Sequence, residues 1–371
     1  MASNPSNRKI VNKKSSGNAA LSAPALESSD ELSKFLAVAG KKHSKGTIQK
    51  GVDTRANYGK LQTGILALDI ALNGGFSLSR VNMLYGYASS GKSTLATISI
   101  ARMQKLNPNS MIFYVDIEGT FDKQWAETLG VDLDRLYLVE PDTGEDAVDL
   151  ICGCLRIDTV SLVVVDSIAM LSPMKEIESA ADDNFVALQA RLVGSCIRKI
   201  TNAVITERKR DHHPIVFLIN QFRTNIGQMF GDNRTLPGGN ILKYAVSQSI
   251  EMKNKEIKQT TEGGDGLKGE VLYNEHSFNI TKDKTGGSVK EGDFRLIRSK
   301  SIGLPVGFVD QTKHILKTAK RLGLYSGGGV KQVIDGLVFS SEDDLTRQLA
   351  GDPELSFAIV SKLTALTLES M

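Results

Sequence analysis

Several features that would assign a protein to a special class are missing from this sequence. No apolar run approaches the roughly 18–20 residues of a membrane span, and no signal-peptide core opens the chain. The 45 basic and 42 acidic residues leave a net charge of only +3, so the overall charge does not indicate a nucleic-acid partner. We therefore expect neither secretion nor a membrane contact, and any nucleic-acid site must come from local clusters of basic side chains.

Cysteine and histidine are scarce as well, which argues against a metal centre. The three cysteines, Cys152, Cys154 and Cys196, form neither a C-x-x-C pair nor a zinc pattern, and the five histidines show no metal-ligand spacing. Cys154 continues an apolar helical stripe, so we expect its thiol to be buried and reduced. This usage fits a reducing cytoplasm.

The composition changes along the 371 residues, which are enough for two or three domains. Residues 1–29 are rich in Ser, Asn and Ala and predict a disordered basic tail. A transit peptide is the alternative, although no clear amphipathic stripe supports it. The next segment, "SSDELSKFLAVAG", predicts a short helix that presents Leu32, Phe35 and Leu36 and packs on something else. We divide the chain into this tail, an N-terminal arm at 30–58, a core at 59–304 and a small C-terminal α/β domain at 305–371.

The core alternates short apolar strands with amphipathic helices. The strand-like runs are "VNMLYG", "MIFYVD", "LYLVEP", "LVVVD" and "PIVFLIN", and helical patterns cover 93–105, 144–157 and 186–206. Such a pattern predicts an α/β fold with a mainly parallel sheet covered on both faces, in which ligands bind beyond the carboxyl ends of the strands. The polar segment 254–272 predicts a loop or a flexible hairpin tip.

One strand end carries the strongest motif. "GYASSGKS", Gly86 to Ser93, fits G-x-x-x-x-G-K-[ST], follows a strand and precedes a helix, which is the context of a phosphate-binding loop. Its glycines let backbone N–H groups face phosphate oxygens at the positive end of the helix. Lys92 would bind the β/γ-phosphates and Ser93 a Mg²⁺ ion, which predicts ATP and Mg²⁺ as cofactors. The expected nucleotide contacts are Gly86, Tyr87, Ala88, Ser89, Ser90, Gly91, Lys92, Ser93 and Thr94.

Carboxylates stand at two other strand ends. "LVVVD" ends in Asp166, from which a carboxylate can support Mg²⁺ together with Ser93, and Ser167 follows it. "FYVDIEGTFD" places Asp116 and Glu118 at the end of another core strand, where both would face the nucleotide crevice. A carboxylate beside an attacking water can orient it and accept its proton, so we expect Glu118 to be the catalytic base. A merely solvated strand end is the alternative.

A long, glycine-rich loop follows the strand "PIVFLI". The stretch "NQFRTNIGQMFGDNRTLPGGN", residues 220–240, is far longer than the roughly 4–6 residues of most connections, and it holds two arginines and one acid. A plain surface loop does not explain the apolar residues Ile226, Met229 and Phe230 within it. The composition therefore predicts a functional loop.

Together these segments resemble the bacterial RecA recombinase family. "TGILALDIALNGG", "VEPDTGEDAVDL", "VVVDSIAMLSPMKEIE", "INQFRTNIGQMFG", "GGNILKYA" and "TKDK" occur in the family's order, and the resemblance covers roughly residues 30 to 371. It implies a RecA-type P-loop core and a DNA-dependent ATPase that forms helical filaments on single-stranded DNA and pairs it with homologous duplex DNA, in recombination and repair. Single-strand-binding protein and loading mediators would be further partners, in the cytoplasm of a bacterium or of a phage-infected host.

The resemblance assigns the long loop to DNA. It implies two DNA-binding loops, at about 178–187 and 221–239, with Val186 and Ile226 as the side chains that wedge between bases. Arginines would contact phosphates, and Gln221 would sense the γ-phosphate and reorder the second loop. The implied DNA-binding residues are Val186, Arg191, Arg198, Arg223, Ile226, Arg234, Gly238, Gly239 and Asn240.

Helical spacing supports two of these arginines. Arg191 and Arg198 are seven residues apart, hence on one helical face, and that face lies opposite Val193, Cys196 and Ile200. Both arginines should therefore point out of the core, toward DNA. A merely solvated polar face is the alternative.

The resemblance also completes the ATP site. Asp122 and Trp125 match positions that hydrogen-bond and stack on adenine, and tryptophan should stack at least as well as the usual tyrosine. Lys282 and Lys284 alternate along a strand-like segment and match lysines that reach the γ-phosphate of a neighbouring subunit, on which the 30–58 arm would pack. A pair of surface lysines is the alternative. Arg298 stands where the family has tyrosine, and the family's acidic C-terminal tail is missing from the sequence; a phage-encoded member would explain such departures.

Other protein classes share a phosphate loop on an α/β sheet. A small-molecule kinase should show an arginine-rich lid, which is not evident here. A hexameric RecA-core helicase or motor ATPase would use an arginine finger where this chain has the "TKDK" lysines. A non-enzymatic DNA-coating protein is the reading that follows if Glu118 is not catalytic.

Overall fold

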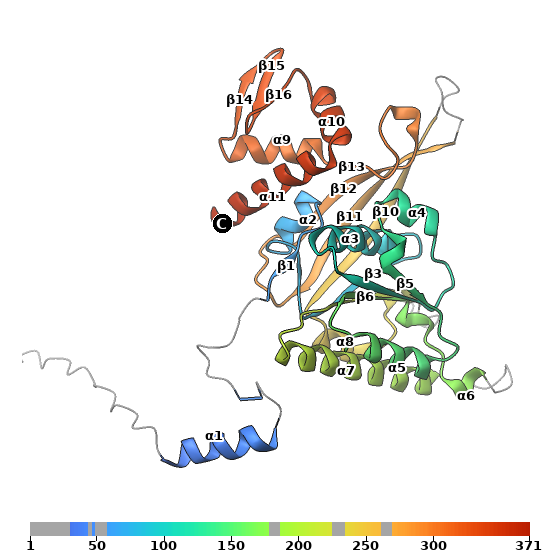
Figure 1. Ribbon diagram of the computed structural model, residues 1–371. Helices are drawn as coiled ribbons and strands as arrows, with labels where there is room; N and C mark the ends of the chain where they lie inside the picture. The colour runs from blue at the N-terminus through green and yellow to red at the C-terminus, as the bar shows by residue number, and fades with distance from the viewer. Residues whose placement is uncertain (1–29, 44–46, 49–57, 178–185, 225–233, 261–268) are drawn as a thin grey trace, which may run out of the picture. The chain divides into compact units, whose positions relative to one another are not determined.

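The computed structural model describes residues 30–43, 47–48, 58–177, 186–224, 234–260 and 269–371 (Figure 1). The chain forms two compact units, residues 1–54 and residues 55–371. In the first unit the described chain contains helix α1 (Asp30–Lys42), and the side chains of Leu32, Phe35 and Leu36 are exposed. The expected short helix therefore forms, with these three apolar side chains in solvent.

The second unit is built on a nine-stranded sheet in the order β13-β12-β11-β10-β3-β7-β6-β4-β5. The six strands from β10 to β5 run parallel, and β11, β12 and β13 extend the sheet in antiparallel fashion. The strands are β3 (Val81–Gly86), β4 (Met111–Asp116), β5 (Leu136–Val139), β6 (Val160–Asp166), β7 (Ile215–Gln221), β10 (Gln248–Lys258), β11 (Val271–Asp283), β12 (Glu291–Ile297) and β13 (Val309–Asp310). The five apolar runs in the sequence form β3 to β7, and the prediction of an α/β fold with a mainly parallel sheet is confirmed.

Helices cover both faces of this sheet (Figure 1). One face carries α2 (Leu66–Ala71), α3 (Lys92–Leu106) and α4 (Lys123–Thr128), and the other carries α5 (Gly144–Cys154), α7 (Val186–Lys209) and α8 (Gly239–Ala245). Strand β6 is buried on both faces. Leu162 and Val164 pack in the apolar core on the α3 face, Val163 and Val165 pack in the core on the α7 face, and all four are fully buried. A strand buried on both faces has no polar side to alternate with, so its run is continuously apolar. The expected helices form, with ends shifted by up to three residues.

On the antiparallel side, β10 and β11 reach into the segment 254–272 that the sequence assigned to a loop or hairpin tip. The two strands pair from Gln248 opposite Asp283 to Lys258 opposite Val271. Most of the outer side chains here are polar and exposed, so no apolar period marks the strands. The centre of the segment, residues 261–268, lies outside the described chain.

The C-terminal residues form a smaller α/β layer beside α2. It consists of α9 (Thr312–Arg321), β14 (Tyr325–Gly328), β15 (Lys331–Ile334), β16 (Leu337–Phe339), α10 (Glu342–Gly351) and α11 (Pro353–Glu369). Its apolar core includes Leu66 of α2. Gln311 joins the two layers, because its Oε1 accepts from Leu66 N and its Nε2 donates to the Gly64 carbonyl oxygen, both at 2.7 Å. The predicted boundary of a separate domain at residue 305 stays a prediction.

Short elements complete the fold: β1 (Lys60–Leu61), β2 (Phe76–Ser77), β8 (Arg223–Thr224), β9 (Arg234–Thr235), α6 (Met174–Ile177) and 3-10 turns at Leu133–Arg135, Ile168–Met170 and Lys300–Ile302. None of the described helices is long and apolar enough to cross a membrane. Cys154 is buried as a free thiol, as its helical stripe predicts, and burial raises its pKa to about 11. Such a thiol is unreactive near neutral pH.

Candidate nucleotide site and DNA interface

The phosphate loop joins β3 to α3 at the carboxyl edge of the parallel strands. Gly91, just before α3, has φ +92°, a left-handed conformation that glycine adopts without strain. Gly86 lies so close to the neighbouring strand that a Cβ there would be 2.4 Å from the Met252 carbonyl oxygen. Both glycines are therefore required by the turn, which ends at the N-terminus of α3, where helix geometry favours phosphate. The loop has the shape that the motif requires.

Lys92 is 7% exposed and its ammonium group lies within the loop. Its Nζ donates to the Tyr87 carbonyl oxygen at 2.6 Å and to Ser90 Oγ at 3.3 Å. Burial lowers the pKa of Lys92, and the charges of Asp166 and Glu118 act in the opposite direction. Phosphate oxygens would replace neutral acceptors with charged ones, so the residue fits a phosphate-binding role.

Asp166, at the end of β6, is the centre of a compact hydrogen-bonded group. Its Oδ2 accepts from Ser93 Oγ and from Tyr114 OH, each at 2.6 Å. Burial raises the pKa of Asp166, while these two hydroxyls lower it. A carboxylate beside a serine hydroxyl is the donor set that holds Mg²⁺ in phosphate-loop proteins, so Ser93 and Asp166 fit that ion. Tyr114 gives no signal in the sequence, because a tyrosine inside an apolar strand looks like an ordinary core residue.

Glu118 follows β4 and lies beside the end of β6. Ser167 Oγ donates to Glu118 Oε1 at 2.5 Å, and the Glu118 side chain is otherwise open to solvent. A water molecule can therefore reach this carboxylate. Asp116 differs from expectation: it is buried, and its Oδ2 accepts from Phe121 N at 2.8 Å. Asp116 thus shapes the loop after β4 instead of facing the crevice.

A cavity of about 320 Å³ lies between the phosphate loop and the β10–β11 ribbon. Its far wall consists of Asn254, Glu256, Val271, Asn274, His276 and Arg298. Of these residues, only Arg298 could be singled out from the sequence. The available signal was the spacing of two residues in "NKE" at 254–256 and "NEH" at 274–276, which puts the outer members of each triplet on one face of a strand.

Asp122 and Trp125 lie at the start of α4. Asp122 Oδ1 accepts from Trp125 N at 2.9 Å and so caps the helix. The guanidinium of Arg298 lies 4.1 Å from the centre of the Trp125 ring, a cation–π contact. Arg298, which stands where the family has tyrosine, therefore lies next to Trp125, the ring predicted to stack on the base. Adenine binding by Asp122 and Trp125 stays a prediction.

Gln221 ends β7 directly beside the phosphate loop. It pairs with Gly86 across the two strands, and Phe222 N donates to the Gly86 carbonyl oxygen at 3.1 Å. Strands β8 and β9 then close the base of the long loop, with Arg223 opposite Thr235. The phosphate loop and the predicted DNA loop are thus joined by a backbone hydrogen bond. Ile226 and its neighbours from 225 to 233 lie outside the described residues.

Arg223 and Arg234 both have protein partners at the base of this loop. Arg223 donates to the Ala169 carbonyl oxygen at 2.6 Å. Arg234 donates to Glu251 Oε1 at 3.2 Å, and its guanidinium lies 4.8 Å from the centre of the Phe222 ring. A DNA phosphate would therefore compete with Glu251 for Arg234. Phosphate contacts by these arginines stay predictions.

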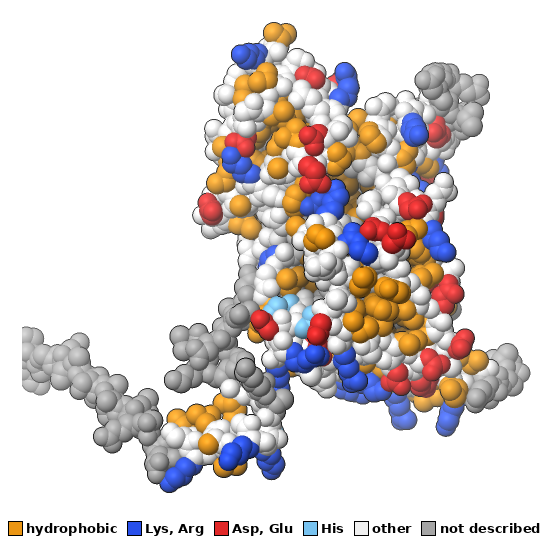
Figure 2. All heavy atoms as spheres, in the orientation of Figure 1, with side chains coloured by type: hydrophobic (Ala, Val, Ile, Leu, Met, Phe, Trp, Pro, Cys, Tyr) orange, Lys and Arg blue, Asp and Glu red, His pale blue; other side chains and the backbone are white. Residues whose placement is uncertain are grey.

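The predicted arginine face of α7 is exposed. Arg191 and Arg198 lie in solvent, whereas Val193 and Cys196 are buried, as the helical spacing predicts. Figure 2 shows Lys and Arg side chains along the lower edge of the larger unit, where α7 lies in Figure 1. Val186 is the first residue of α7, and its side chain is outside the description. DNA contact by this face stays a prediction.

Gly238 and Gly239 form the turn into α8. Their φ angles are +93° and +55°. A Cβ at Gly238 would lie 2.8 Å from Leu242 Cδ1 and 2.9 Å from Val193 Cγ1, so this turn packs tightly on α7. Asn240 lies in the first turn of α8, and its side chain is not among those described.

Lys282 and Lys284 lie at the end of β11, where it leaves the sheet. Burial and the neighbouring charge of Lys284 lower the pKa of Lys282 to about 8. Lys284 follows Asp283, the last residue of β11, so the expected alternation along a strand stays a prediction. Lys284 Nζ donates to the Tyr244 carbonyl oxygen at 2.7 Å. Two neighbouring positive charges favour an anion beside them. Their role across a subunit interface stays a prediction.

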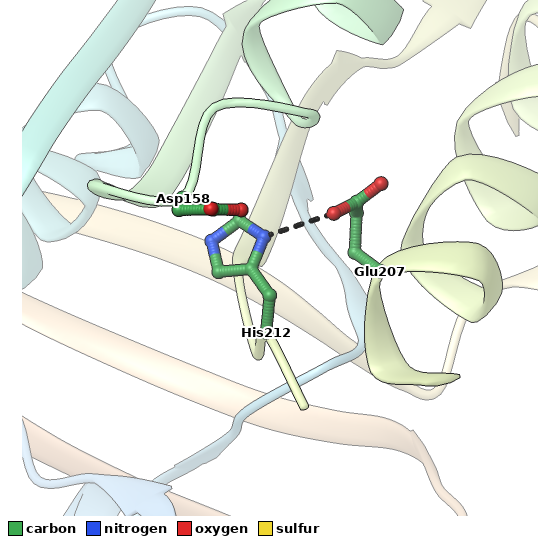
Figure 3. A group of neighbouring side chains, drawn as sticks. All are labelled: Asp158, Glu207 and His212. Carbon is green, nitrogen blue, oxygen red and sulfur yellow. Dashed lines mark hydrogen bonds and ion pairs between the residues drawn. The ribbon is translucent and has the colours of Figure 1, made fainter. Parts of the chain in front are cut away.

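Asp158, Glu207 and His212 form the one group of potential metal ligands found among the described residues (Figure 3). His212 Nδ1 lies 3.3 Å from Glu207 Oε2, and its Nε2 lies 2.8 Å from the Val160 carbonyl oxygen. Arg210 donates to Glu207 at 2.8 Å and to Asp158 at 3.0 Å. Because a guanidinium already neutralises both carboxylates, we interpret this group as an ion-pair cluster that ties the end of α7 to β6.

Comparison with known proteins supports the family that the order of the motifs indicates. The family model described as RecA N-terminal domain matches residues 30–303. "Protein RecA" of Francisella tularensis subsp. novicida (strain U112) is 38% identical to this chain over 274 residues, which are 73% of this chain and 72% of that protein. The same values hold for "Protein RecA" of Francisella tularensis subsp. tularensis (strain SCHU S4 / Schu 4). The family match includes the phosphate loop and both lysines of "TKDK" and ends before the C-terminal layer.

Proposed function

The chain belongs to the RecA family, and from this premise we propose that it is a DNA-dependent ATPase that forms helical filaments on single-stranded DNA and exchanges strands with homologous duplex DNA. Family membership supports ATP use and a general role in recombination and repair. The observation that carries the ATPase proposal is the group at three strand ends: Lys92 within its loop, Ser93 bonded to Asp166, and Glu118 bonded to Ser167.

Each member of this group has a separate task. Bound Mg²⁺–ATP supplies the phosphoryl group and the negative charge that the site must neutralise. Lys92 would neutralise that charge from within the loop, while Ser93 and Asp166 would hold the ion. Glu118 is exposed, so it can orient a water molecule and accept its proton. The Ser167 hydroxyl fixes the orientation of the Glu118 carboxylate at 2.5 Å.

The nucleotide and the DNA would be coupled through the end of β7. Phe222 N donates to the carbonyl oxygen of Gly86, the first residue of the phosphate loop, at 3.1 Å. A movement of that loop would therefore displace the base of the segment 221–239 directly. Release of Arg234 from Glu251 would then make a guanidinium available to a DNA phosphate. Ordering of a loop by the γ-phosphate is a known kind of switch.

Filament formation would complete the ATP site with a neighbouring subunit. Lys282 and Lys284 form a closely spaced positive pair that an anion would stabilise, and the γ-phosphate of the adjacent protomer is the anion that we assign to them. Helix α1, with Leu32, Phe35 and Leu36 in solvent, would pack on that protomer. The cytoplasm is the compartment where such a protein would meet single-stranded DNA, single-strand-binding protein and loading mediators.

The deciding experiment measures ATP hydrolysis with and without single-stranded DNA, alongside electron microscopy of the assembled protein. We expect DNA to stimulate hydrolysis and helical filaments to form on it when ATP is present. An ATP hydrolysis rate that is the same with and without single-stranded DNA would contradict the proposal. Closed rings that unwind duplex DNA would instead support the alternative, a hexameric helicase or motor ATPase on the same core.

A further inference from the structure

The chain turns sharply after β11, at the segment that carries Lys282 and Lys284. We call residues 282–287 the lysine turn. The proposed function assigns its two lysines to the γ-phosphate of an adjacent protomer. A lysine side chain is long and flexible, so the place that its ammonium group can reach depends on how firmly the backbone beneath it is fixed. The contacts of the lysine turn therefore bear on the reaction.

Thr285 is the centre of these contacts. Its Oγ1 donates to Asp283 Oδ1 at 2.6 Å and accepts from Lys60 Nζ at 2.9 Å and from Gln248 Nε2 at 3.2 Å. These bonds use the whole capacity of a hydroxyl, which has one donor and two lone pairs. We call Thr285 and its three partners the clamp. Because Asn73 Nδ2 also donates to the Thr285 carbonyl oxygen at 3.1 Å, the turn is bound through side chain and backbone.

The Asp283 carboxylate closes the turn from within. Its Oδ1 also accepts from Thr285 N at 2.7 Å, and its Oδ2 accepts from Gly287 N at 2.9 Å. A Cβ at Gly287 would lie 2.2 Å from the Ala71 carbonyl oxygen and 2.6 Å from Asp283 Oδ2, so only glycine fits. The backbone on both sides of Lys284 is therefore fixed by one carboxylate and packed against the end of α2.

The other two members of the clamp belong to the core. Lys60 is partly buried, and its Nζ also donates to the Leu72 carbonyl oxygen at 3.0 Å. Burial lowers the pKa of Lys60 to about 8 while the charge of Asp283 acts in the opposite direction, so the ammonium group is largely protonated at pH 7. Gln248 is fully buried, and its Oε1 accepts from Ser77 N at 3.0 Å. Withdrawing such groups from water is costly, and a turn that only reverses the chain does not need them.

We propose that the clamp positions Lys282 and Lys284 for the transferring phosphate of the adjacent protomer, with Thr285 as its central residue. This inference rests on the proposed function, which places the two lysines at that phosphate. Lys284 N donates to the Ser247 carbonyl oxygen at 3.0 Å, and Lys284 Nζ donates to the Tyr244 carbonyl oxygen at 2.7 Å. The ammonium group can exchange that carbonyl for a phosphate oxygen by turning its side chain, provided that the clamp keeps the backbone in place. The clamp residues thus act through the lysines and need not touch the nucleotide.

Thr285→Val tests the clamp, because it removes the hydroxyl and keeps the shape of the side chain. DNA-stimulated turnover should fall about tenfold or more, since a displacement of about 1 Å can cost about 10²-fold. Thr285→Ser keeps the hydroxyl and should stay near the wild-type rate. Equilibrium binding of ATP without DNA should be unchanged in both variants, because their phosphate loop is intact. Ser288→Ala is the matched control, since it removes an exposed hydroxyl close to the same turn.

Mixing experiments separate positioning from damage to the fold. Thr285→Val subunits mixed with Lys92→Ala subunits should regain part of the hydrolysis, because some junctions then combine an intact phosphate loop with correctly placed lysines. Mixed with Lys282→Ala/Lys284→Ala subunits, they should gain nothing, since no junction contains a correctly placed pair. Equal recovery with both partners, or recovery with neither, would mean that the variant is damaged elsewhere and would overturn the proposal.

Lys60→Met is an independent variant, because it keeps most of the side-chain stem and removes only the ammonium group. It should lower turnover less than Thr285→Val and show the same dependence on the mixing partner. Full turnover in either variant would overturn the proposal and leave the proposed function intact. Failure of the proposed function has another signature: wild-type hydrolysis then does not respond to DNA, or the Lys282→Ala/Lys284→Ala protein is as active as wild type.

Discussion

The nucleotide cavity has two walls that satisfy their polar groups in different ways. In the phosphate-loop wall, formed by residues 89–94, Lys92 and Ser93 each have a hydrogen-bond partner. In the hairpin wall, formed by β10 and β11, Asn274 and His276 have buried polar atoms with no regular partner in the described chain. An unpaired buried polar atom costs about 1–3 kcal/mol. The fold thus pairs the polar groups of the first wall, whereas the second keeps buried polar atoms that a bound ligand would pair.

Removing the cation of the phosphate-loop wall should have the largest effect. Lys92→Ala deletes the buried ammonium group that neutralises phosphate charge, so DNA-stimulated ATP hydrolysis should fall by about 10³-fold or more and ATP-supported filaments should be lost. Lys105→Ala, at an exposed ion pair with Glu354, is the matched control and should hydrolyse normally. Steady-state hydrolysis with single-stranded DNA measures both. Full activity in Lys92→Ala would end the nucleotide assignment.

Glu118→Gln tests the chemistry beside the phosphate-loop wall while keeping the shape of the site. The amide cannot accept the proton of water, so turnover should fall about 10²-fold, while ATP-dependent binding to single-stranded DNA persists. Hydrolysis and fluorescence-anisotropy binding should be measured on the same preparation, with exposed Glu127→Gln as control. Turnover near the wild-type rate would mean that another group is the base.

Substitution of Lys282 and Lys284 tests whether the hairpin side contributes to the ATP site of an adjacent subunit. Lys282→Ala/Lys284→Ala subunits should lose most DNA-stimulated hydrolysis, because the transferring phosphate loses its cross-subunit charge. Mixing them with Lys92→Ala subunits should restore part of it, since some junctions then contain both intact halves. The mixture must be tested under conditions where it assembles on DNA. A double-lysine variant as active as wild type would refute the role in trans.

The neutral imidazole of His276, in the hairpin wall, predicts a pH dependence of the free energy of unfolding. Burial lowers the pKa of His276 from 6.5 to about 4, so between these values the unfolded chain binds more protons than the folded one. The folded state therefore loses stability as the pH falls from 6.5 to 4, by about 3 kcal/mol from this group. His276→Gln should remove this component in urea unfolding measured at pH 7, 5.5 and 4.

His314→Gln is the control for that experiment, because His314 is partly exposed and paired with Asp293. If wild type and His276→Gln lose stability in parallel as the pH falls, the imidazole is not buried in its neutral form.

The smallest expected effect concerns Arg223, at the base of the predicted DNA-binding loop. Arg223→Ala should weaken binding to single-stranded DNA similarly for all sequences and reduce the magnitude of the salt slope by about 0.7, the value for one lost phosphate contact. Binding titrations at several salt concentrations give this slope. An unchanged slope would remove Arg223 from the phosphate contacts and would favour its hydrogen bond to the Ala169 carbonyl oxygen as its main role.

The phosphate-loop wall could be predicted because a parallel sheet has a simple rule. The carboxyl ends of its strands meet at one edge, so Asp166 and Glu118 had to lie near the loop that contains Lys92. The rule fails for Asp116, which is buried and bonded to Phe121 N, because the turn after β4 decides which carboxylate faces out. The hydrogen bond from Tyr114 to Asp166 could not be predicted, because a tyrosine in an apolar strand gives no periodic signal.

The hairpin wall could not be predicted from the pattern. Asn254 and His276 become partners through an antiparallel register between two polar strands, and no local signal specifies that register. A shift by one residue would turn both side chains to the opposite face. The contact between His276 and Gly91 then depends on how the ribbon packs over the phosphate loop.

The sequence by itself determined the parallel α/β core, the phosphate loop at 86–93 and the family of the chain, because buried strands and a phosphate turn require particular residues at fixed local spacings. Tertiary structure alone decided that Arg298 lies over Trp125, that Arg234 is held by Glu251, and that Asn254, Asn274 and His276 face the nucleotide cavity. These contacts join segments far apart in the chain, and their geometry follows from strand register and packing, which no short stretch of sequence encodes.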